Sequence, residues 1–131
     1  MKRILLDTNT YAAFKRNDQI AMSIIRTSEY LGINVIVLGE LYGGFKGGSK
    51  EKTNKEELEQ FLDSPRVQII QLDEETAEFY ANIYWDLKKK GKPVPSNDMW
   101  VAASAMRHGL ALFTYDEHFK DIKGLLLRGE I

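Results

Sequence analysis

The 131-residue sequence contains no cysteine, which excludes disulfide bonds and thiolate metal sites. It also lacks an apolar run near the roughly 20 residues that a membrane span requires. The apolar run behind Met1-Lys2-Arg3 stops at Asp7, too early for the core of a signal peptide. These absences fit a reducing compartment, so we expect a cytoplasmic location and no membrane segment.

An excess of positive charge is missing as well. The chain has 18 Lys and Arg against 19 Asp and Glu, a net charge of −1, whereas a dedicated duplex-binding protein usually carries a basic face. Lysines nevertheless cluster in residues 88–92 and, more thinly, in residues 46–55. Either cluster could contact RNA phosphates, although solubility and compensation of a helix dipole are commoner roles for such runs.

Apolar, β-branched segments alternate with segments of helical periodicity along the chain. The expected strands cover residues 3–7, 33–37, 67–72, 111–114 and 125–127. The expected helices cover residues 8–15, 18–31, 38–45, 54–62, 74–90 and 96–108. This alternation predicts one α/β domain over residues 1–131, with a central, mainly parallel sheet of about five strands. The carboxyl ends of such strands share one edge of the sheet.

Several local features refine this prediction. Thr8 and Ser96 are expected to cap their helices, Gly32 to end the second helix, and Asp73 to cap the long helix. The glycines of residues 43–48 should fray the third helix into a mobile loop, since each costs about 1 kcal/mol relative to alanine. On the long helix, the spacing predicts a core stripe made of Ala77, Tyr80, Tyr84 and Leu87.

Four acidic residues fall at the predicted sheet edge. Asp7 ends the first strand, and Glu40 is expected in the first turn of the helix after the second strand. Asp98 lies in the first turn of the last helix, and Asp116 follows the fourth strand. Each has a commoner role alone, as a cap, a solvated acid or a turn residue. Together they form a candidate site at the carboxyl ends of parallel strands.

Gathered carboxylates require a counter-ion. Two of them about 5 Å apart repel by roughly 3 kcal/mol at an effective dielectric constant near 20, and three or four could not all stay ionised alone. Oxygen-rich sites suit Mg²⁺ or Mn²⁺. The acids therefore predict a site for a hard divalent metal ion.

Four segments of the sequence resemble PIN-domain nucleases, and in particular VapC-type toxins of type II toxin–antitoxin systems. They are residues 6–9 (LDTN), 39–41 (GEL), 95–103 (PSNDMWVAA) and 112–119 (LFTYDEHF). The resemblance implies a three-layer α/β/α fold and Mg²⁺ or Mn²⁺ bound by Asp7, Glu40, Asp98 and Asp116. It further implies that Asn9 and Thr114 orient a carboxylate or a metal-bound water.

The resemblance also implies an endoribonuclease that cleaves tRNA or another structured RNA, forms a homodimer and is inhibited by a VapB-like antitoxin. Three alternatives stay open: a PIN-type nuclease of RNA processing, a non-catalytic binding module and a phospho-accepting receiver domain. A receiver domain needs an acidic pair after the first strand, whereas Asp7 stands alone there. Trp85 and Trp100 are expected in the core or an interface. His118, two residues past Asp116, could approach the candidate site, although a solvated turn is the commoner place for it.

Overall fold

The computed structural model describes residues 2–128 and contains one sheet of four parallel strands. The strands are β1 (Arg3–Leu6), β2 (Tyr30–Asn34), β3 (Val67–Ile70) and β4 (Ala111–Phe113), in the order β3-β2-β1-β4. The expected fifth strand at residues 125–127 is reduced to a single bridge between Leu112 and Leu127. The parallel α/β class is confirmed, with four strands in place of about five.

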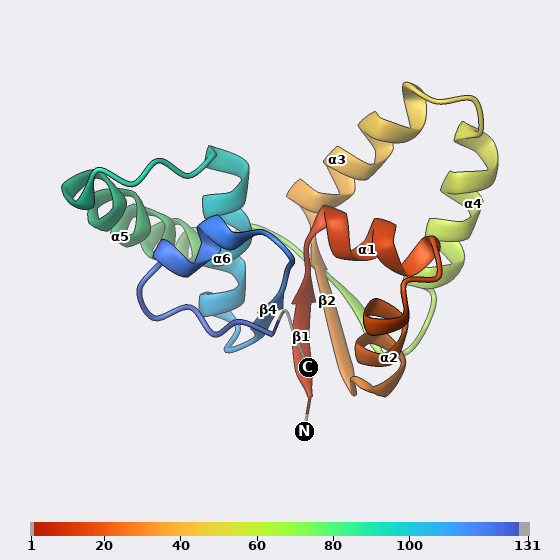
Figure 1. Ribbon diagram of the computed structural model, residues 1–131, viewed down its shortest axis with the longest axis horizontal. Coiled ribbons are helices and arrows are strands. Elements are labelled where there is room, and N and C mark those ends of the chain that lie inside the picture. Colours follow the sequence, from red (N-terminus) through yellow and green to blue (C-terminus); the bar gives the residue numbers. More distant parts are fainter. Residues whose placement is uncertain (1, 129–131) are drawn as a thin grey trace.

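Helices cover both sides of this sheet. They are α1 (Thr8–Lys15), α2 (Gln19–Thr27), α3 (Val35–Lys46), α4 (Glu51–Leu62), α5 (Glu74–Lys90) and α6 (Ser96–Arg107), with a 3₁₀ helix η1 (Glu117–Asp121). In Figure 1, α1, α2 and α4 lie on one side of the strands, and α5 and α6 lie on the other. This is the expected three-layer arrangement. Within residues 2–128, no helix is both long and apolar enough to cross a membrane.

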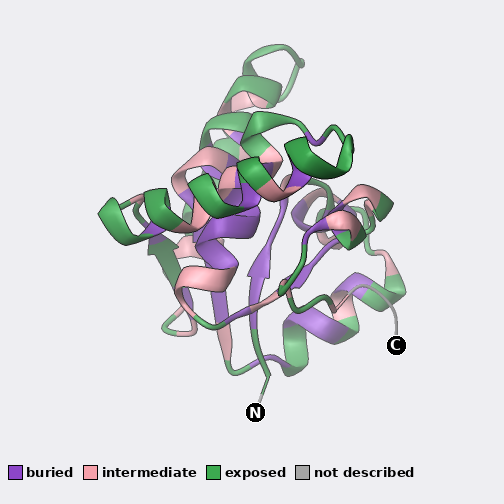
Figure 2. Ribbon diagram, turned by 90° about the vertical axis from the view of Figure 1, so that its left-hand side faces the viewer, coloured by how far each residue is buried: buried purple, intermediate pink, exposed green. Residues whose placement is uncertain are grey.

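Strand β1 is the centre of the core. Its residues Ile4, Leu5 and Leu6 are at most 1% exposed, because the strand pairs with β2 on one edge and β4 on the other. A strand covered on both faces needs an unbroken apolar run, which is what the sequence supplies. Figure 2 shows that buried residues gather on the strands and inner helix faces, while exposed residues cover the outer helices. The end of β1 is therefore held rigidly.

The boundary between α2 and β2 differs from the prediction. Helix α2 ends at Thr27, and β2 begins at Tyr30, three residues before the expected strand. Gly32 is not a helix cap but a buried strand residue. A Cβ atom there would lie 2.7 Å from Ile70 Cδ1 and 3.1 Å from a methyl carbon of Leu5. Close packing across the sheet, rather than a turn, explains this glycine.

The expected fraying of α3 does not occur. The helix runs through Gly43 and Gly44 to Lys46, and α4 follows after a short loop. Leu41 is buried, while Tyr42 and Phe45 pack against the core, so tertiary contacts outweigh the weak helix propensity of glycine. The helix starts at Val35, which places Glu40 in the second turn rather than the first. Glu40 therefore lies beyond the first turn, where the partial positive charge of a helix N-terminus would stabilise a carboxylate.

Helix α5 matches its predicted ends and half of its predicted core stripe, since Leu87 is buried and Tyr80 packs against the core. Asp73 caps it by accepting a hydrogen bond from the Thr76 backbone N–H at 2.9 Å, and Gly91 ends it in the left-handed conformation (φ 66°). The buried residues are Thr76, Ile83 and Leu87, whereas Ala77 and Tyr84 are exposed. The helix is rotated relative to the prediction, which turns a row of aromatic side chains outward.

Candidate active site

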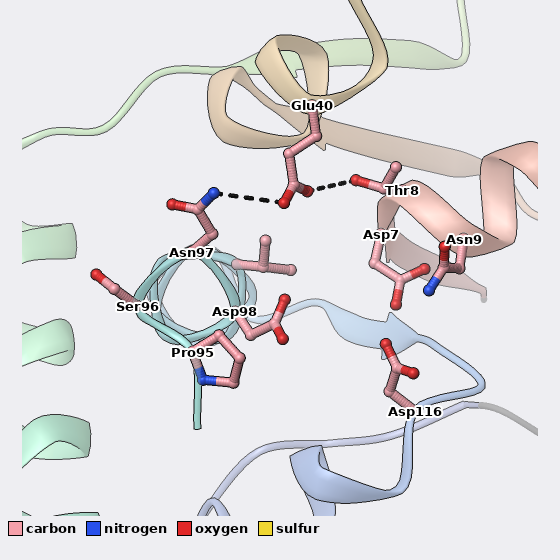
Figure 3. A pocket seen from close by; sticks show the side chains of 10 residues that line it. Asp7, Thr8, Asn9, Glu40, Pro95, Ser96, Asn97, Asp98 and Asp116 are labelled. Carbon is pink, nitrogen blue, oxygen red and sulfur yellow. Dashed lines mark hydrogen bonds between the residues drawn. The ribbon is translucent and has the colours of Figure 1, made fainter. Parts of the chain in front are cut away.

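One cavity of about 520 Å³ lies at the carboxyl ends of β1 and β4, between α3 and the N-terminus of α6. All four predicted acids are among the ten residues that line it. The ten are Asp7, Thr8, Asn9, Glu40, Pro95, Ser96, Asn97, Asp98, Val101 and Asp116. Figure 3 shows the carboxylates of Asp7, Asp98 and Asp116 facing a shared space, with Glu40 above them. Residues that are distant in sequence thus meet at one edge of the sheet.

Asp7 is both a helix cap and a wall of the cavity. Its Oδ1 accepts hydrogen bonds from the backbone N–H and the hydroxyl of Thr10, each at 2.9 Å, which caps α1. Its Oδ2 accepts a hydrogen bond from the Thr114 hydroxyl at 2.5 Å. The expected cap, Thr8, does not serve that role. The two candidate roles of Asp7 are therefore compatible, because each uses a different carboxylate oxygen.

Burial sets the electrostatics of this carboxyl group. Asp7 is 5% exposed, and this desolvation raises its pKa above the ordinary value, because the charged form loses water. Hydrogen bonds from Thr114 and Thr10 lower the pKa, and the negative charge of Asp116 raises it. The net direction is upward. The ionised form of Asp7 therefore costs free energy in the folded chain, and a cation in the cavity would reduce that cost.

Asp98 shares this environment. It is half-buried in the first turn of α6, and its Oδ2 lies 2.7 Å from Nε2 of His118. Burial raises the pKa of Asp98, contact with His118 lowers it, and the charges of Glu40 and Asp116 raise it. Of the two expected places for His118, the structure shows the approach to the acids and not the solvated turn. The signal in the sequence was its position two residues after Asp116, on the same loop.

Glu40 is held in place by two neighbours. Its Oε1 accepts a hydrogen bond from the Thr8 hydroxyl at 2.5 Å, and its Oε2 accepts one from the Asn97 amide at 3.3 Å (Figure 3). These bonds join α1, α3 and α6 around one exposed carboxylate. Ser96 does not cap α6 as expected, because Pro95 occupies the cap position. Its hydroxyl instead lies 3.1 Å from the Tyr80 hydroxyl.

Asp116 and Asn9 complete the cavity. Asp116 follows β4, and its backbone N–H donates to the Thr114 hydroxyl at 3.0 Å, so one threonine positions two of the acids. Its carboxylate points toward Asp7 and Asp98 in Figure 3. Asn9 is exposed at the rim beside Asp7. All six residues singled out in the sequence thus lie in or directly behind this cavity.

The chemistry of the cavity fits a hard divalent ion. Its ten lining residues offer carboxylate, hydroxyl and amide oxygens and include no lysine or arginine. Among residues 2–128, no three acidic or histidine side chains lie close enough to hold one ion together. Mg²⁺ keeps several of its waters and binds proteins through one or two carboxylates, so this spacing suits an ion held partly through water. The charge of Asp116 raises the pKa of Asp7 and of Asp98, so a cation in the cavity would favour the ionised form of both.

Comparison with known proteins defines the class of this fold and site. Residues 4–125 match the model of the PIN domain. The chain is 30% identical over 128 residues to ribonuclease VapC2 of Rickettsia felis, covering 94% of each protein. The chain therefore belongs to the PIN-domain family, in its VapC group.

Solved structures agree with this assignment. VapBC from Salmonella typhimurium bound to DNA superposes with a TM-score of 0.85, at 27% identity and 98% coverage of both chains. VapBC2 from Rickettsia felis, bound to a fragment of its promoter DNA, superposes with a TM-score of 0.82 at 28% identity, covering 95% of this chain and 96% of the other.

Proposed function

We propose that this chain is an endoribonuclease that hydrolyses RNA phosphodiester bonds with Mg²⁺ or Mn²⁺. The observation that carries the proposal is the cavity, where Asp7, Glu40, Asp98 and Asp116 face each other. No lysine or arginine among its lining residues compensates their charge. The names of similar proteins, such as ribonuclease VapC2, support the same reaction. An all-oxygen site of this kind suits phosphoryl chemistry.

The protein groups divide into ligands and groups that orient them. The four acids would hold the divalent ion partly through bound waters, and the ion would supply an activated water and neutralise charge on the reacting phosphate. Thr114 fixes the Asp7 carboxylate through its hydroxyl, and His118 fixes that of Asp98. Thr8 and Asn97 fix Glu40 from two sides. Such partners preserve ligand geometry, and their loss commonly costs 10–100-fold in metal affinity or activity.

Asn9 has a different position from these supporting residues. Its side chain is exposed at the rim, beside the buried carboxylate of Asp7. An amide there can donate a hydrogen bond to a phosphate oxygen or to a water entering the cavity. We assign Asn9 to orientation of the substrate or of that water.

We further propose that the chain acts in the cytoplasm as one PIN domain and a homodimer. Its substrate would be tRNA or another structured RNA, and a VapB-like antitoxin would control it. The neighbouring structures of VapB–VapC assemblies support such a partner. The acidic cavity also suits inhibition, since a basic antitoxin side chain placed in it would compensate the charge that otherwise favours the metal.

The decisive experiment compares RNA cleavage by purified wild type, Asp98→Asn and Asp63→Asn. Asp63 is an exposed aspartate at the end of α4, outside the cavity lining, and serves as the matched control. Wild type and the control should cleave total cellular RNA with Mg²⁺ or Mn²⁺ and not with EDTA, while Asp98→Asn should be inactive but folded. Sequencing of the new RNA ends would identify the substrate. Full cleavage by Asp98→Asn would refute the proposal.

A further inference from the structure

Helix α5 presents an unusual exposed surface near the cavity. Trp85 is 56% exposed and Tyr84 is 40% exposed, and both continue a row that begins with the half-buried Tyr80 and Trp100. We call Tyr80, Tyr84, Trp85 and Trp100 the aromatic ladder. Burial of such rings normally stabilises a fold, so rings left in water on one face indicate a binding surface.

The rings of the ladder are arranged for stacking. Tyr80 stacks on Trp100 with ring centroids 4.1 Å apart and planes inclined by 22°. Tyr80 and Tyr84 are close to parallel, at 17°, but their centroids are 6.5 Å apart. Trp85 stands nearly perpendicular to Tyr84, at 83° with ring centroids 5.9 Å apart. Tyr84 and Trp85, the two exposed rings, therefore offer separate faces on which a base can stack.

Positive charge accompanies the exposed rings. Nζ of Lys88 lies 5.7 Å from the centroid of Tyr84 and 5.5 Å from that of Trp85. Lys89 and Lys92 are exposed next to it along the chain. Protein–protein interfaces are depleted of charged residues at their centre, whereas single-stranded nucleic-acid sites combine aromatic rings with lysines. The composition of this face thus favours a polyanion with aromatic groups over a second protein surface.

The ladder is connected to the acidic cavity. The Tyr80 hydroxyl lies 3.1 Å from the hydroxyl of Ser96, and Ser96 lines the cavity two residues before Asp98. From Tyr80 to Lys88 the helix rises about 12 Å, at 1.5 Å per residue. At the ~3.4 Å rise per base of a stacked strand, that length corresponds to about three or four bases.

We infer that the aromatic ladder, with Lys88, is a binding track for single-stranded RNA that leads to the acidic cavity. Bases stack on Tyr84 and Trp85, and lysine side chains contact the phosphates. The inference rests on the proposed ribonuclease function and adds where the strand beside the cleaved bond is held. Because every base has an aromatic face, the track binds RNA with little sequence preference.

The test measures binding separately from cleavage. A fluorescein-labelled single-stranded oligoribonucleotide is titrated with the full chain in EDTA, where metal-dependent cleavage is absent. Trp85→Leu combined with Tyr84→Leu should raise the Kd by about thirtyfold or more, since stacking on each of the two aromatic side chains is worth ~1–3 kcal/mol. Trp85→Phe should bind almost as well as wild type, because it keeps a ring. This pair of variants separates stacking from simple apolar contact.

Two control variants match the exposure and charge of the altered residues. Ile69→Ala removes an apolar side chain that is 45% exposed on β3, and it should leave the Kd unchanged. Lys88→Gln should weaken binding and reduce its salt dependence, whereas Lys52→Gln, an exposed lysine on α4, should not. Thermal melting of each variant establishes that it is folded.

The possible results are distinct. An unchanged Kd for the doubly substituted ladder, or no RNA binding by wild type, overturns the inference. Light scattering that shows the ladder variant as a monomer and wild type as a dimer also overturns it, because the face then binds a second copy. If wild type binds RNA through the ladder but shows no cleavage with Mg²⁺ or Mn²⁺, the proposed function fails instead.

Discussion

Replacing Asp7 with asparagine should abolish cleavage and yet make the protein more stable at neutral pH. Burial raises the pKa of Asp7 above its ordinary value of 3.8, so the folded chain carries the ionised group at a cost. Asparagine has the same shape and caps helices as well as aspartate does. Its amide can also donate to the Thr114 hydroxyl oxygen that now contacts Asp7. The substitution therefore removes the charge and keeps the packing.

The direction with pH follows from the raised pKa. Below about 3.8 the carboxyl is protonated in both the folded and the unfolded chain, and wild type and Asp7→Asn should be equally stable. As pH rises through the folded pKa, wild type alone loses stability, because its folded state binds the proton more tightly. Each unit by which the folded chain raises this pKa is worth about 1.4 kcal/mol, so the gain of Asp7→Asn at neutral pH reports the size of the shift directly.

The chain contains a matched control in Asp73. This residue caps α5 as Asp7 caps α1, accepting bonds from the backbone and hydroxyl of Thr76 at 2.9 and 2.8 Å. It is exposed, and the bonds from Thr76, with a contribution from Arg107, lower its pKa to about 2. Its ionised form is therefore favourable, and Asp73→Asn should destabilise the protein above this pKa.

Urea unfolding in EDTA, followed by tryptophan fluorescence at several pH values, measures both effects. Mg²⁺ or Mn²⁺ should then stabilise wild type, by RT ln(1 + [L]/Kd), and stabilise Asp7→Asn much less. The reasoning is refuted if Asp7→Asn is less stable than wild type at neutral pH. It is equally refuted if the gain is as large near pH 4 as at neutral pH.

Three further substitutions test other parts of the site and fold. His118→Ala should weaken Mn²⁺ binding by about tenfold in calorimetry, because the Asp98 carboxylate loses the partner that orients it, and His118→Gln should bind more like wild type. Equal Mn²⁺ affinities of His118→Ala and wild type would contradict this role. Thr8→Val should lower the cleavage rate about tenfold while the melting temperature changes little, because Glu40 loses its shortest bond; an unaltered rate argues against it. Gly32→Val should lower the free energy of unfolding in urea by about 1–3 kcal/mol, since even a Cβ atom would lie 2.7–3.1 Å from neighbouring methyl groups. A variant as stable as wild type would contradict this close packing.

The sequence predicted the position of the acids better than their environment. An apolar run that ends in aspartate indicated a site at the end of β1, and the structure places Asp7 there. Asp7 and Asp73 nevertheless have the same local pattern. Each aspartate caps a helix and lies three residues before a threonine. Only the tertiary structure makes the pKa of one rise and that of the other fall. Local sequence cannot show which cap is buried beside other carboxylates.

The incorrect predictions have a common cause. Local propensity predicts a helix end at Gly32 and at Gly43 and Gly44. Gly32 is instead fixed by close packing across the sheet, and the core contacts of Leu41, Tyr42 and Phe45 carry α3 through its two glycines. His118 was likewise judged by its neighbours in the chain, while its partner Asp98 lies 20 residues away. Contacts between segments distant in sequence outweigh local propensity in each case. Such contacts could be found only from the folded arrangement.

The pairing of β1 with β4 has a consequence for synthesis of the chain. Asp7 is made 107 residues before its partner Thr114. β1 also pairs with β4 through Leu6 and Phe113. Until the ribosome has released residues 111–116, the central strand has an open edge and the cavity lacks Asp116. The proposed ribonuclease activity is therefore withheld from the nascent chain until these residues have been made.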